Sequence, residues 1–225
     1  MIQRVYEQVL KAGCLSDVIV ATDDERILNH VKQFGGKAVM TSEAHRSGTE
    51  RCFEAYKTFS EDENDFDIII NIQGDEPFIN PQQIDDVAAC FDDENTQIAS
   101  LAKIIKNVEE LHNPNVVKLV IDNKNNALYF SRCPIPFNRD ANVDDAIKKI
   151  NYLKHVGIYA YRSHILKAIC KLPSSKLELS ESLEQLRWLE NSYRIKINFT
   201  DNESVAIDSP DDIVKAEQFL SSGNK

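Results

Sequence analysis

Residues Phe66–Ile72 read FDIIINI, and the polar segment Gln73–Pro77 (QGDEP) follows them directly. A near-continuous apolar run of this length is typical of a strand that is covered on both faces, as strands of parallel sheets are. Helical patterns alternate with strand patterns ahead of this run, and that alternation indicates an α/β fold. Because open α/β sheets bind their ligands at the carboxyl ends of strands, QGDEP is a candidate for the functional site.

The patterns on either side of this run predict the other elements. In the N-terminal part we expect helices at 2–13, 23–34 and 49–59, and strands at 17–22 and 37–41. In the C-terminal part we expect strands at 98–104, 116–121, 127–131, 155–162, 195–200 and 205–207, and helices at 178–193 and 210–220. The chain has no internal repeat and no Gly/Ser-rich linker. We therefore predict one domain over residues 1–225, with a three-layer, mostly parallel mixed sheet.

The composition of the 225 residues is that of an ordinary globular protein, with 42% hydrophobic residues. The sequence has 26 Lys and Arg residues and 36 Asp and Glu residues, which gives a net charge of −10. Because binding to phosphates requires a basic surface, we expect no nucleic-acid partner. No uncharged apolar run approaches the roughly 18 residues of a membrane span, and the charged N-terminus is unlike a signal peptide. Five widely spaced cysteines indicate buried free thiols. We expect a cytoplasmic protein with no membrane partner.

Two carboxylates are candidates for holding a metal ion. Asp75 and Asp208 each follow a predicted strand, and two carboxylates from separate strand ends can share one Mg²⁺, which prefers oxygen ligands. The alternative for Asp75 is a surface turn, since Gly74 and Pro77 supply turn geometry. Ser209 and Pro210 have the pattern of a helix start, but that cap does not require Asp208.

The loop that contains Ser47, Thr49 and Arg51 opens a predicted helix. Its hydroxyl groups can cap the helix, and together with its arginines and the helix N-terminus they can alternatively bind an anion. The sequence has no G-x-G-x-x-G and no Walker A motif. His155, at the start of an apolar strand, is either a core histidine or a functional one.

Several segments, in this order, resemble the 3-deoxy-manno-octulosonate cytidylyltransferases, also called CMP-Kdo synthetases. They are VATDDERI, H-x-SGTER, NIQGDEPFI, NPNVVKLV, ALYFSR-x-PIPF-x-RD, H-x-GIYAYR, LE-x-LEQLRWLE and IDSPDD. The resemblance runs from the first residue to about Leu220, and the combination of segments is far more specific than any single one.

This resemblance implies a nucleotide-diphospho-sugar transferase fold of the glycosyltransferase A type, a homodimer, and the reaction CTP + Kdo → CMP-Kdo + pyrophosphate for lipopolysaccharide biosynthesis. It implies that Asp75 and Asp208 hold Mg²⁺ and are the catalytic residues. Around Kdo it places Gln73, Arg132, His155, Tyr159, Glu184 and Gln185, with Arg132 a partner for the carboxylate. Ser47 and Arg51 are expected on the CTP side.

The family pattern also includes a strand and a cationic phosphate-binding loop ahead of the residue that matches Met1. A chain that lacks them is expected to bind CTP weakly, because Arg46 and Arg51 do not replace a backbone cradle. Two interpretations compete with an active CMP-Kdo synthetase. One is a cytidylyltransferase for another sugar acid, such as sialate. The other is a catalytically impaired chain that keeps the fold and dimerises.

Overall fold

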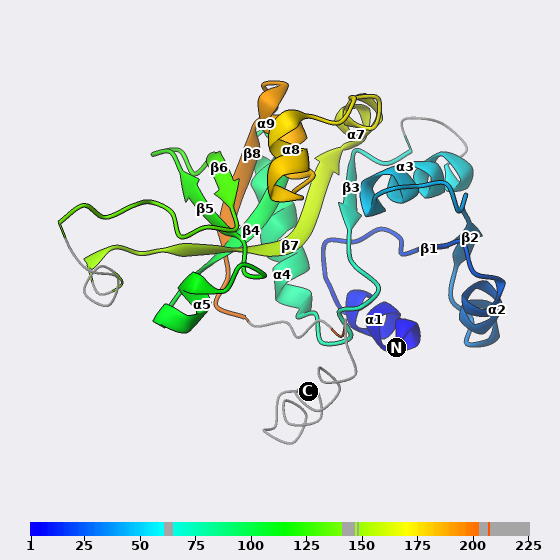
Figure 1. The fold of residues 1–225 in the computed structure, drawn as a ribbon. Helices are drawn as coiled ribbons and strands as arrows, with labels where there is room; N and C mark the ends of the chain where they lie inside the picture. Colours follow the sequence, from blue (N-terminus) through cyan, green and yellow to red (C-terminus); the bar gives the residue numbers. More distant parts are fainter. Residues whose placement is uncertain (61–64, 141–146, 148, 203–206, 208–225) are drawn as a thin grey trace, which may run out of the picture.

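The computed structural model describes residues 1–60, 65–140, 147, 149–202 and 207, and its strands form two sheets (Figure 1). The small sheet pairs β1 (Val20–Thr22) with β2 (Ala38–Met40) in parallel. The six-stranded sheet has the order β6-β5-β7-β4-β8, with β3 also paired to β7. Its strands are β3 (Ile68–Asn71), β4 (Ile98–Ile104), β5 (Lys118–Ile121), β6 (Ala127–Ser131), β7 (Leu153–Arg162) and β8 (Ile195–Phe199).

The large sheet is mixed, as predicted. Strands β3, β4, β5 and β8 run in one direction, whereas β6 and β7 run in the other. Because β7 lies between strands of the opposite direction, the direct pairs around it are antiparallel, and the parallel pair of this sheet is β4–β8. The sheet is mostly parallel in the sense that β3, β4, β5 and β8 all run in one direction. The strand β3 nevertheless pairs with its neighbour β7 in an antiparallel manner.

The helices begin where the sequence supplies capping side chains. Asp24 caps α2, Ser47 caps α3, and Asn80 forms a capping box with Gln83 at the start of α4. By contrast, α1 has no side-chain cap. The helices are α1 (Ile2–Val9), α2 (Glu25–Gln33), α3 (Gly48–Phe59), α4 (Pro81–Ala88), η1 (Ala89–Asp92), α5 (Val108–His112), α7 (Ser163–Ile169), α8 (Lys176–Glu181) and α9 (Gln185–Glu190).

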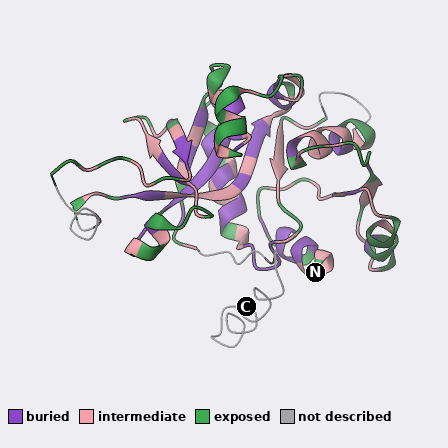
Figure 2. Ribbon diagram, viewed as in Figure 1, coloured by how far each residue is buried: buried purple, intermediate pink, exposed green. Residues whose placement is uncertain are grey.

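The core lies on both faces of the large sheet (Figure 2). On one face, α1 and α4 pack against Leu101 and Ala160, and on the other, α7 and α9 pack against Tyr161. Strand β4 is buried along almost its whole length, whereas β3 is half-buried throughout. The three-layer architecture is thus as predicted, but the most deeply covered strand is β4 and not the FDIIINI run.

Three expectations need correction. The helix predicted over 178–193 is broken into α8 and α9, because Ser182 adopts a left-handed conformation with φ 53°. The strand predicted from Asp17 begins only at Val20. All five cysteines are free, but Cys14 and Cys133 are exposed and not buried. The helix predicted at 210–220, the metal candidate Asp208 and, except for Ile207, the strand predicted at 205–207 lie outside the described residues.

Helices α4, α5 and α7 were not predicted from the sequence. In the described part of the chain, no helix is both long and apolar enough to cross a bilayer.

The break at Ser182 generates a prediction for stability. A left-handed residue with a side chain is strained, so Ser182→Gly should raise the free energy of unfolding by about 0.5 kcal/mol. The matched control is Ser180→Gly, within α8, which should lower stability by about 0.5 kcal/mol because glycine weakens a helix interior. Urea unfolding measures both changes, and a loss of stability in Ser182→Gly contradicts the conformation described here.

Candidate active site

Strand β7 is the element around which the predicted site residues are arranged. One edge of β7 pairs with β4, but its other edge is shared: β5 pairs with Leu153 and Lys154, and β3 pairs with residues 159–162. Residues 156–158 lie between these two partners. The loop after β3 reaches this interval, since Gln73 Nε2 donates to the carbonyl oxygen of Gly157 (3.4 Å). The structure therefore places the QGDEP segment beside the middle of β7.

The Gln73 side chain lies against the backbone of Gly157. A Cβ atom at this position would lie 3.2 Å from Gln73 Nε2 and 4.0 Å from Glu76 Oε1. The first distance is tight and the second is an ordinary contact, so a side chain here would displace the amide end of Gln73 by a few tenths of an ångström. Glycine therefore leaves the Gln73 amide free to reach the β7 backbone.

A β-bulge in the β4–β7 pair fixes His155. The register shifts directly after Ser100, so two residues of β7 have no counterpart on β4. Ser100 is fully buried, and its Oγ lies 2.7 Å from the Ile158 carbonyl oxygen, 3.3 Å from that of Val156 and 2.8 Å from His155 Nε2. Burial lowers the pKa of His155 to about 4. The imidazole is therefore neutral at pH 7.

His155 and Tyr159 form part of an aromatic cluster. The His155 ring centroid lies 5.1 Å from that of Tyr159 and 5.3 Å from that of Phe130, and Trp188 packs edge-on against Tyr159. The Tyr159 hydroxyl is buried and has no hydrogen-bond partner among the described residues. Burial raises its pKa well above the usual value. A buried, unsatisfied hydroxyl is costly, and it is suited to complete its bonding with a ligand.

The corner between α8 and α9 brings Glu184 to the first turn of α3. Glu184 accepts a hydrogen bond from Thr49 Oγ1 (2.7 Å), and an Arg187 nitrogen lies 3.7 Å from its other oxygen. Burial raises the pKa of Glu184, while hydrogen bonds from Thr49 and Ser47 and the Arg187 charge oppose that rise. The neighbouring Gln185 is buried. The structure thus brings Glu184 and Ser47 together, as expected for residues of one site.

Arg132 fastens this corner to the end of β6. Its guanidinium donates to the backbone carbonyl oxygens of Glu181 (2.7 Å), Pro114 (2.9 Å) and Ser182 (3.3 Å). The Glu181 carboxylate in turn accepts from the Ser131 hydroxyl and the Arg132 amide. Arg132 therefore has a structural role in this state, and this tether positions the corner that carries Glu184.

On the other side of α3, Arg51 joins the ends of β1 and β2. It donates to Asp23 Oδ2 (2.5 Å) and to Thr41 Oγ1 (2.6 Å). Ser47 acts as the helix cap, since its Oγ accepts from the Glu50 amide (3.3 Å). The capping alternative is thus confirmed for Ser47, and the described contacts of Arg51 are intramolecular.

Asp75 lies next to a returning part of the chain. The backbone amide of Ile207 donates to the Asp75 carbonyl oxygen (2.9 Å). Ile207 immediately precedes Asp208, which is not among the described residues. Within the described part of the chain, no three His, Cys, Asp or Glu side chains come together as a metal site.

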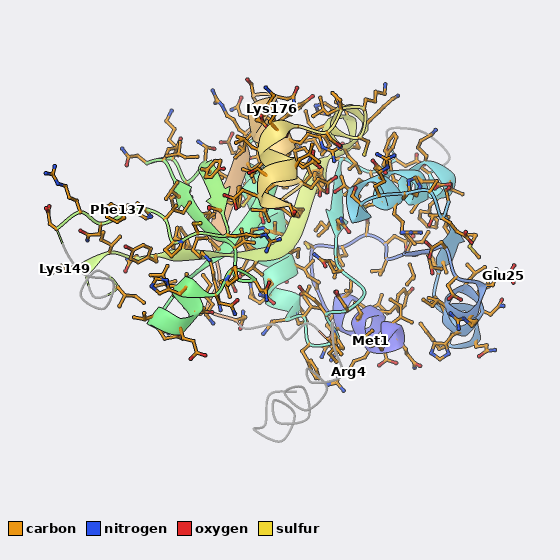
Figure 3. All side chains as sticks on the ribbon, in the orientation of Figure 1. Met1, Arg4, Glu25, Phe137, Lys149 and Lys176 are labelled. Carbon is orange, nitrogen blue, oxygen red and sulfur yellow. The ribbon has the colours of Figure 1, made fainter. Side chains whose placement is uncertain are left out.

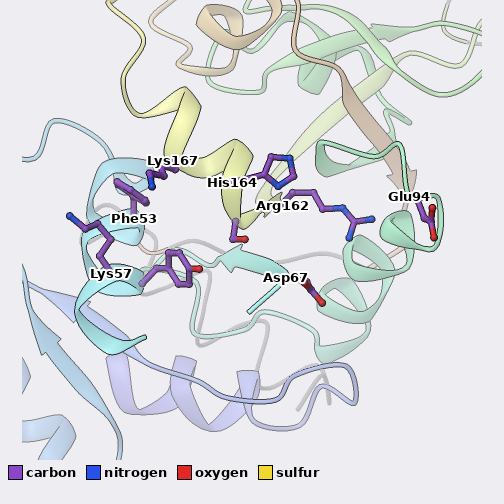
Figure 4. Close-up of a pocket in the computed structure, with 9 residues that line it drawn as sticks. Phe53, Lys57, Asp67, Glu94, Arg162, His164 and Lys167 are labelled. Carbon is purple, nitrogen blue, oxygen red and sulfur yellow. The ribbon is translucent and has the colours of Figure 1, made fainter. Parts of the chain in front are cut away.

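A separate cavity of about 510 Å³ contains none of the predicted site residues (Figure 4). It lies at the far end of β7, and its lining includes Lys57, Asp67, Arg162, His164 and Lys167.

The sequence did not predict three residues that organise the site itself, namely Thr49 as a partner of Glu184, Ser100 and Arg187. Of these three residues, Ser100 had a signal in the sequence, because it is a polar residue inside the apolar run IASLAKI, which forms the buried strand β4.

The arrangement of a mixed sheet, a carboxylate loop at a strand end and a cluster of polar and aromatic side chains beside it is that of an α/β enzyme with a small-molecule site. The sequence pattern of the cytidylyltransferase family matches residues 1–197. A 3-deoxy-manno-octulosonate cytidylyltransferase from Bacteroides thetaiotaomicron is 56% identical, over 98% of this chain and 87% of the relative. One from Parabacteroides distasonis is 53% identical over the same shares. The chain therefore belongs to the cytidylyltransferase family, among the 3-deoxy-manno-octulosonate cytidylyltransferases.

Solved structures agree with this family. The chain is similar to a CMP:2-keto-3-deoxy-manno-octonic acid synthetase that was solved in complex with CTP, with a TM-score of 0.89 and 39% identity. This similarity covers 99% of this chain and 88% of that one. A 4-diphosphocytidyl-2C-methyl-D-erythritol synthase from Anaerococcus prevotii, with a TM-score of 0.62 and 15% identity, shares the fold.

The neutral state of His155 generates a prediction for pH dependence. Its folded pKa of about 4 lies below the ordinary histidine pKa of 6.5, so the unfolded chain binds more protons between these values. Stability from this group is therefore fully present above about pH 6.5 and is lost as pH falls towards 4, by at most about 3 kcal/mol.

Unfolding free energies measured from pH 4 to 7 check this dependence. His155→Gln should flatten the slope in that window, and His112→Gln, at an exposed histidine, should keep it. An unchanged slope in His155→Gln contradicts the depressed pKa.

Proposed function

We propose that this chain transfers CMP from CTP to Kdo (3-deoxy-manno-octulosonate), releasing pyrophosphate and forming CMP-Kdo for lipopolysaccharide biosynthesis. The observation that carries this proposal is the 56% identity, over 98% of the chain, to a relative of that name. The similar structure solved with CTP supports the nucleotide half of the reaction. The sialate alternative has no support from these relatives.

We further propose that the cluster of side chains beside the middle of β7 is the Kdo site. Kdo presents hydroxyl groups and one carboxylate, and this cluster offers the neutral His155, the Tyr159 hydroxyl that lacks a described partner, and the Gln73 amide. Gln185 and Glu184 complete this set from the α8–α9 corner. Arg132 uses three of its five N–H groups for backbone carbonyls, which leaves two for a carboxylate.

In the proposed reaction, the anomeric hydroxyl of Kdo attacks the α-phosphorus of CTP in line and displaces pyrophosphate. Such a step depends on positioning and on charge neutralisation more than on a covalent intermediate. The chain's own contribution is therefore to hold the two substrates in line. Glu184 accepts a hydrogen bond from Thr49, in the first turn of α3, so it lies between the proposed Kdo side and the Ser47–Arg51 side proposed for CTP.

Asp75 and Asp208 are the residues proposed to hold Mg²⁺. Asp75 follows β3 directly, and the hydrogen bond from Ile207 to its carbonyl oxygen places the chain beside Asp75 one residue before Asp208. Two carboxylates are the oxygen donors that Mg²⁺ prefers. When bound, the ion supplies neutralisation of the phosphate charge and of these carboxylates.

Pyrophosphate release in the presence of CTP, Mg²⁺ and a panel of sugar acids tests the function. We expect turnover with Kdo and not with sialate, and turnover with sialate alone contradicts the proposal.

The proposed metal role predicts the effect of Asp75→Asn. Losing one charged ligand should lower kcat by about 100-fold or more, with the midpoint of thermal unfolding nearly unchanged. Asp208→Asn should do the same. The matched control is Asp67→Asn, at the opposite end of β3, which should keep its activity. Near-normal turnover of Asp75→Asn at modest Mg²⁺ removes that residue from the metal site.

The two roles of Arg132, as a tether and as a proposed ligand of the Kdo carboxylate, can be separated by a substitution. Arg132→Ala should raise the KM for Kdo far more than the KM for CTP, since an unpaired carboxylate binds weakly. It should also cost about 1–3 kcal/mol of stability through the lost charged hydrogen bonds. If stability falls while both KM values change equally, Arg132 is only a tether.

We also propose that the protein is cytoplasmic and homodimeric. The proposal of a dimer rests on the resemblance to the 3-deoxy-manno-octulosonate cytidylyltransferases. Phe137, which is 89% exposed in the segment between β6 and β7 (Figure 3), is a candidate contact residue in such a dimer. A monomer mass in sedimentation at micromolar concentration contradicts the dimer.

A further inference from the structure

Ser100 is a polar side chain in the middle of the most deeply buried strand of the sheet. Its exposed fraction is 0%, and it lies at the β-bulge where β7 has two residues more than β4. Its Oγ contacts three groups: the Ile158 carbonyl oxygen (2.7 Å), the Val156 carbonyl oxygen (3.3 Å) and His155 Nε2 (2.8 Å). A serine hydroxyl has one hydrogen to donate to these three neighbours.

The position of that hydrogen follows from the two carbonyl groups. A carbonyl oxygen only accepts, so the short contact with Ile158 is favourable only if Ser100 donates to it. If the hydrogen pointed instead at His155, the Ser100 and Ile158 oxygens would meet at 2.7 Å with no hydrogen between them. Ser100 therefore accepts from His155, and the ring proton of the neutral imidazole lies on Nε2.

The other ring nitrogen is then an acceptor. His155 Nδ1 carries no proton in this tautomer and has no hydrogen-bond partner among the described residues. The ring is packed edge-on against Phe130 at 5.3 Å and tilted against Tyr159 at 5.1 Å. This packing holds its orientation, and the Tyr159 hydroxyl also has no described partner. One acceptor and one hydroxyl without partners, on adjacent rings, suit a ligand hydroxyl group.

We propose that Ser100 is a positioning residue that holds His155 as the Nε2–H tautomer, so that Nδ1 accepts a hydrogen bond from a hydroxyl of Kdo. This inference rests on the proposed function of the side-chain cluster beside β7. It assigns His155 to a sugar hydroxyl and not to the carboxylate, because an acceptor nitrogen repels a carboxylate oxygen. Sites that bind a substrate hydroxyl through a fixed acceptor discriminate strongly against analogues that lack the hydroxyl.

The tautomer is measured in the free protein. In chains labelled with ¹⁵N-histidine at pH 7, the His155 resonances should show a protonated Nε2 and an unprotonated Nδ1. A protonated Nδ1 overturns the inference. Saturating Kdo should then move the Nδ1 resonance upfield, as accepting a hydrogen bond does, and an unmoved Nδ1 in the Kdo-bound protein overturns the role in binding.

Ser100→Ala tests the positioning role. The His155 resonances should shift towards a mixture of tautomers, and the KM for Kdo should rise about tenfold while the KM for CTP changes less than about twofold. The matched control is Thr96→Val, which removes another buried hydroxyl that donates to a backbone carbonyl (Cys90, 2.7 Å). It should leave both readouts unchanged.

Ser100→Ala with a wild-type tautomer and a wild-type KM for Kdo overturns the proposal. If Ser100→Ala does not fold, the wild-type resonances, free and with Kdo, decide the matter. If Kdo does not bind to the wild-type chain, the proposed function fails, and with it the role in binding, whereas the tautomer is still read in the free protein.

Discussion

The division of one edge of β7 between β3 and β5 is the constraint on which the site depends. Because β5 pairs with the beginning of β7 and β3 with its end, the middle of that edge faces a loop and not a strand. The loop is QGDEP, and its Gln73 amide reaches the Gly157 carbonyl oxygen. On the opposite edge, the bulge at Ser100 absorbs two residues of β7. Both edges of the strand thus lose regular pairing at the same point, where backbone and side-chain polar groups become available.

The surroundings of this interval set its chemistry. His155 and Tyr159 lie among Phe130 and Trp188, and burial keeps the imidazole and the phenol neutral. Charged groups are found at the margin, where Arg132 and Glu181 tie the α8–α9 corner to β6. This corner carries Glu184 to Thr49 of α3. Neutral groups suited to sugar hydroxyls and charged groups suited to anions therefore occupy different parts of one site.

The parts of this account that the sequence predicted are those encoded locally. The strand before QGDEP and the Ser47 cap follow from short patterns, and both are present in the structure. The break at Ser182 was not predicted, because it belongs to a corner tied down by Arg132, a residue 50 positions away. Likewise, Ser100 meets His155 only through the register of β4 and β7, which no single segment determines.

The roles of the site residues came from the resemblance of the motifs, and the structure adds the reasons for their positions. Asp75 lies in the loop after β3 and His155 lies on β7, 80 residues further along the chain, and the two are brought to the same region because β3 ends beside the middle of β7. The sequence could not show whether Arg132 binds a ligand or tethers its hairpin. The structure shows that its guanidinium donates to three backbone carbonyl oxygens, which are the contacts of a tether.

The most direct test of the side-chain cluster beside β7 as the Kdo site is Tyr159→Phe, measured for both stability and binding. Removing a buried hydroxyl that has no described partner should leave the free energy of unfolding unchanged or raise it by up to about 1 kcal/mol. The affinity for Kdo, measured by calorimetry, should fall about tenfold because a ligand hydrogen bond is lost. Unchanged Kdo affinity in a stably folded Tyr159→Phe protein would contradict the assignment of this cluster to Kdo.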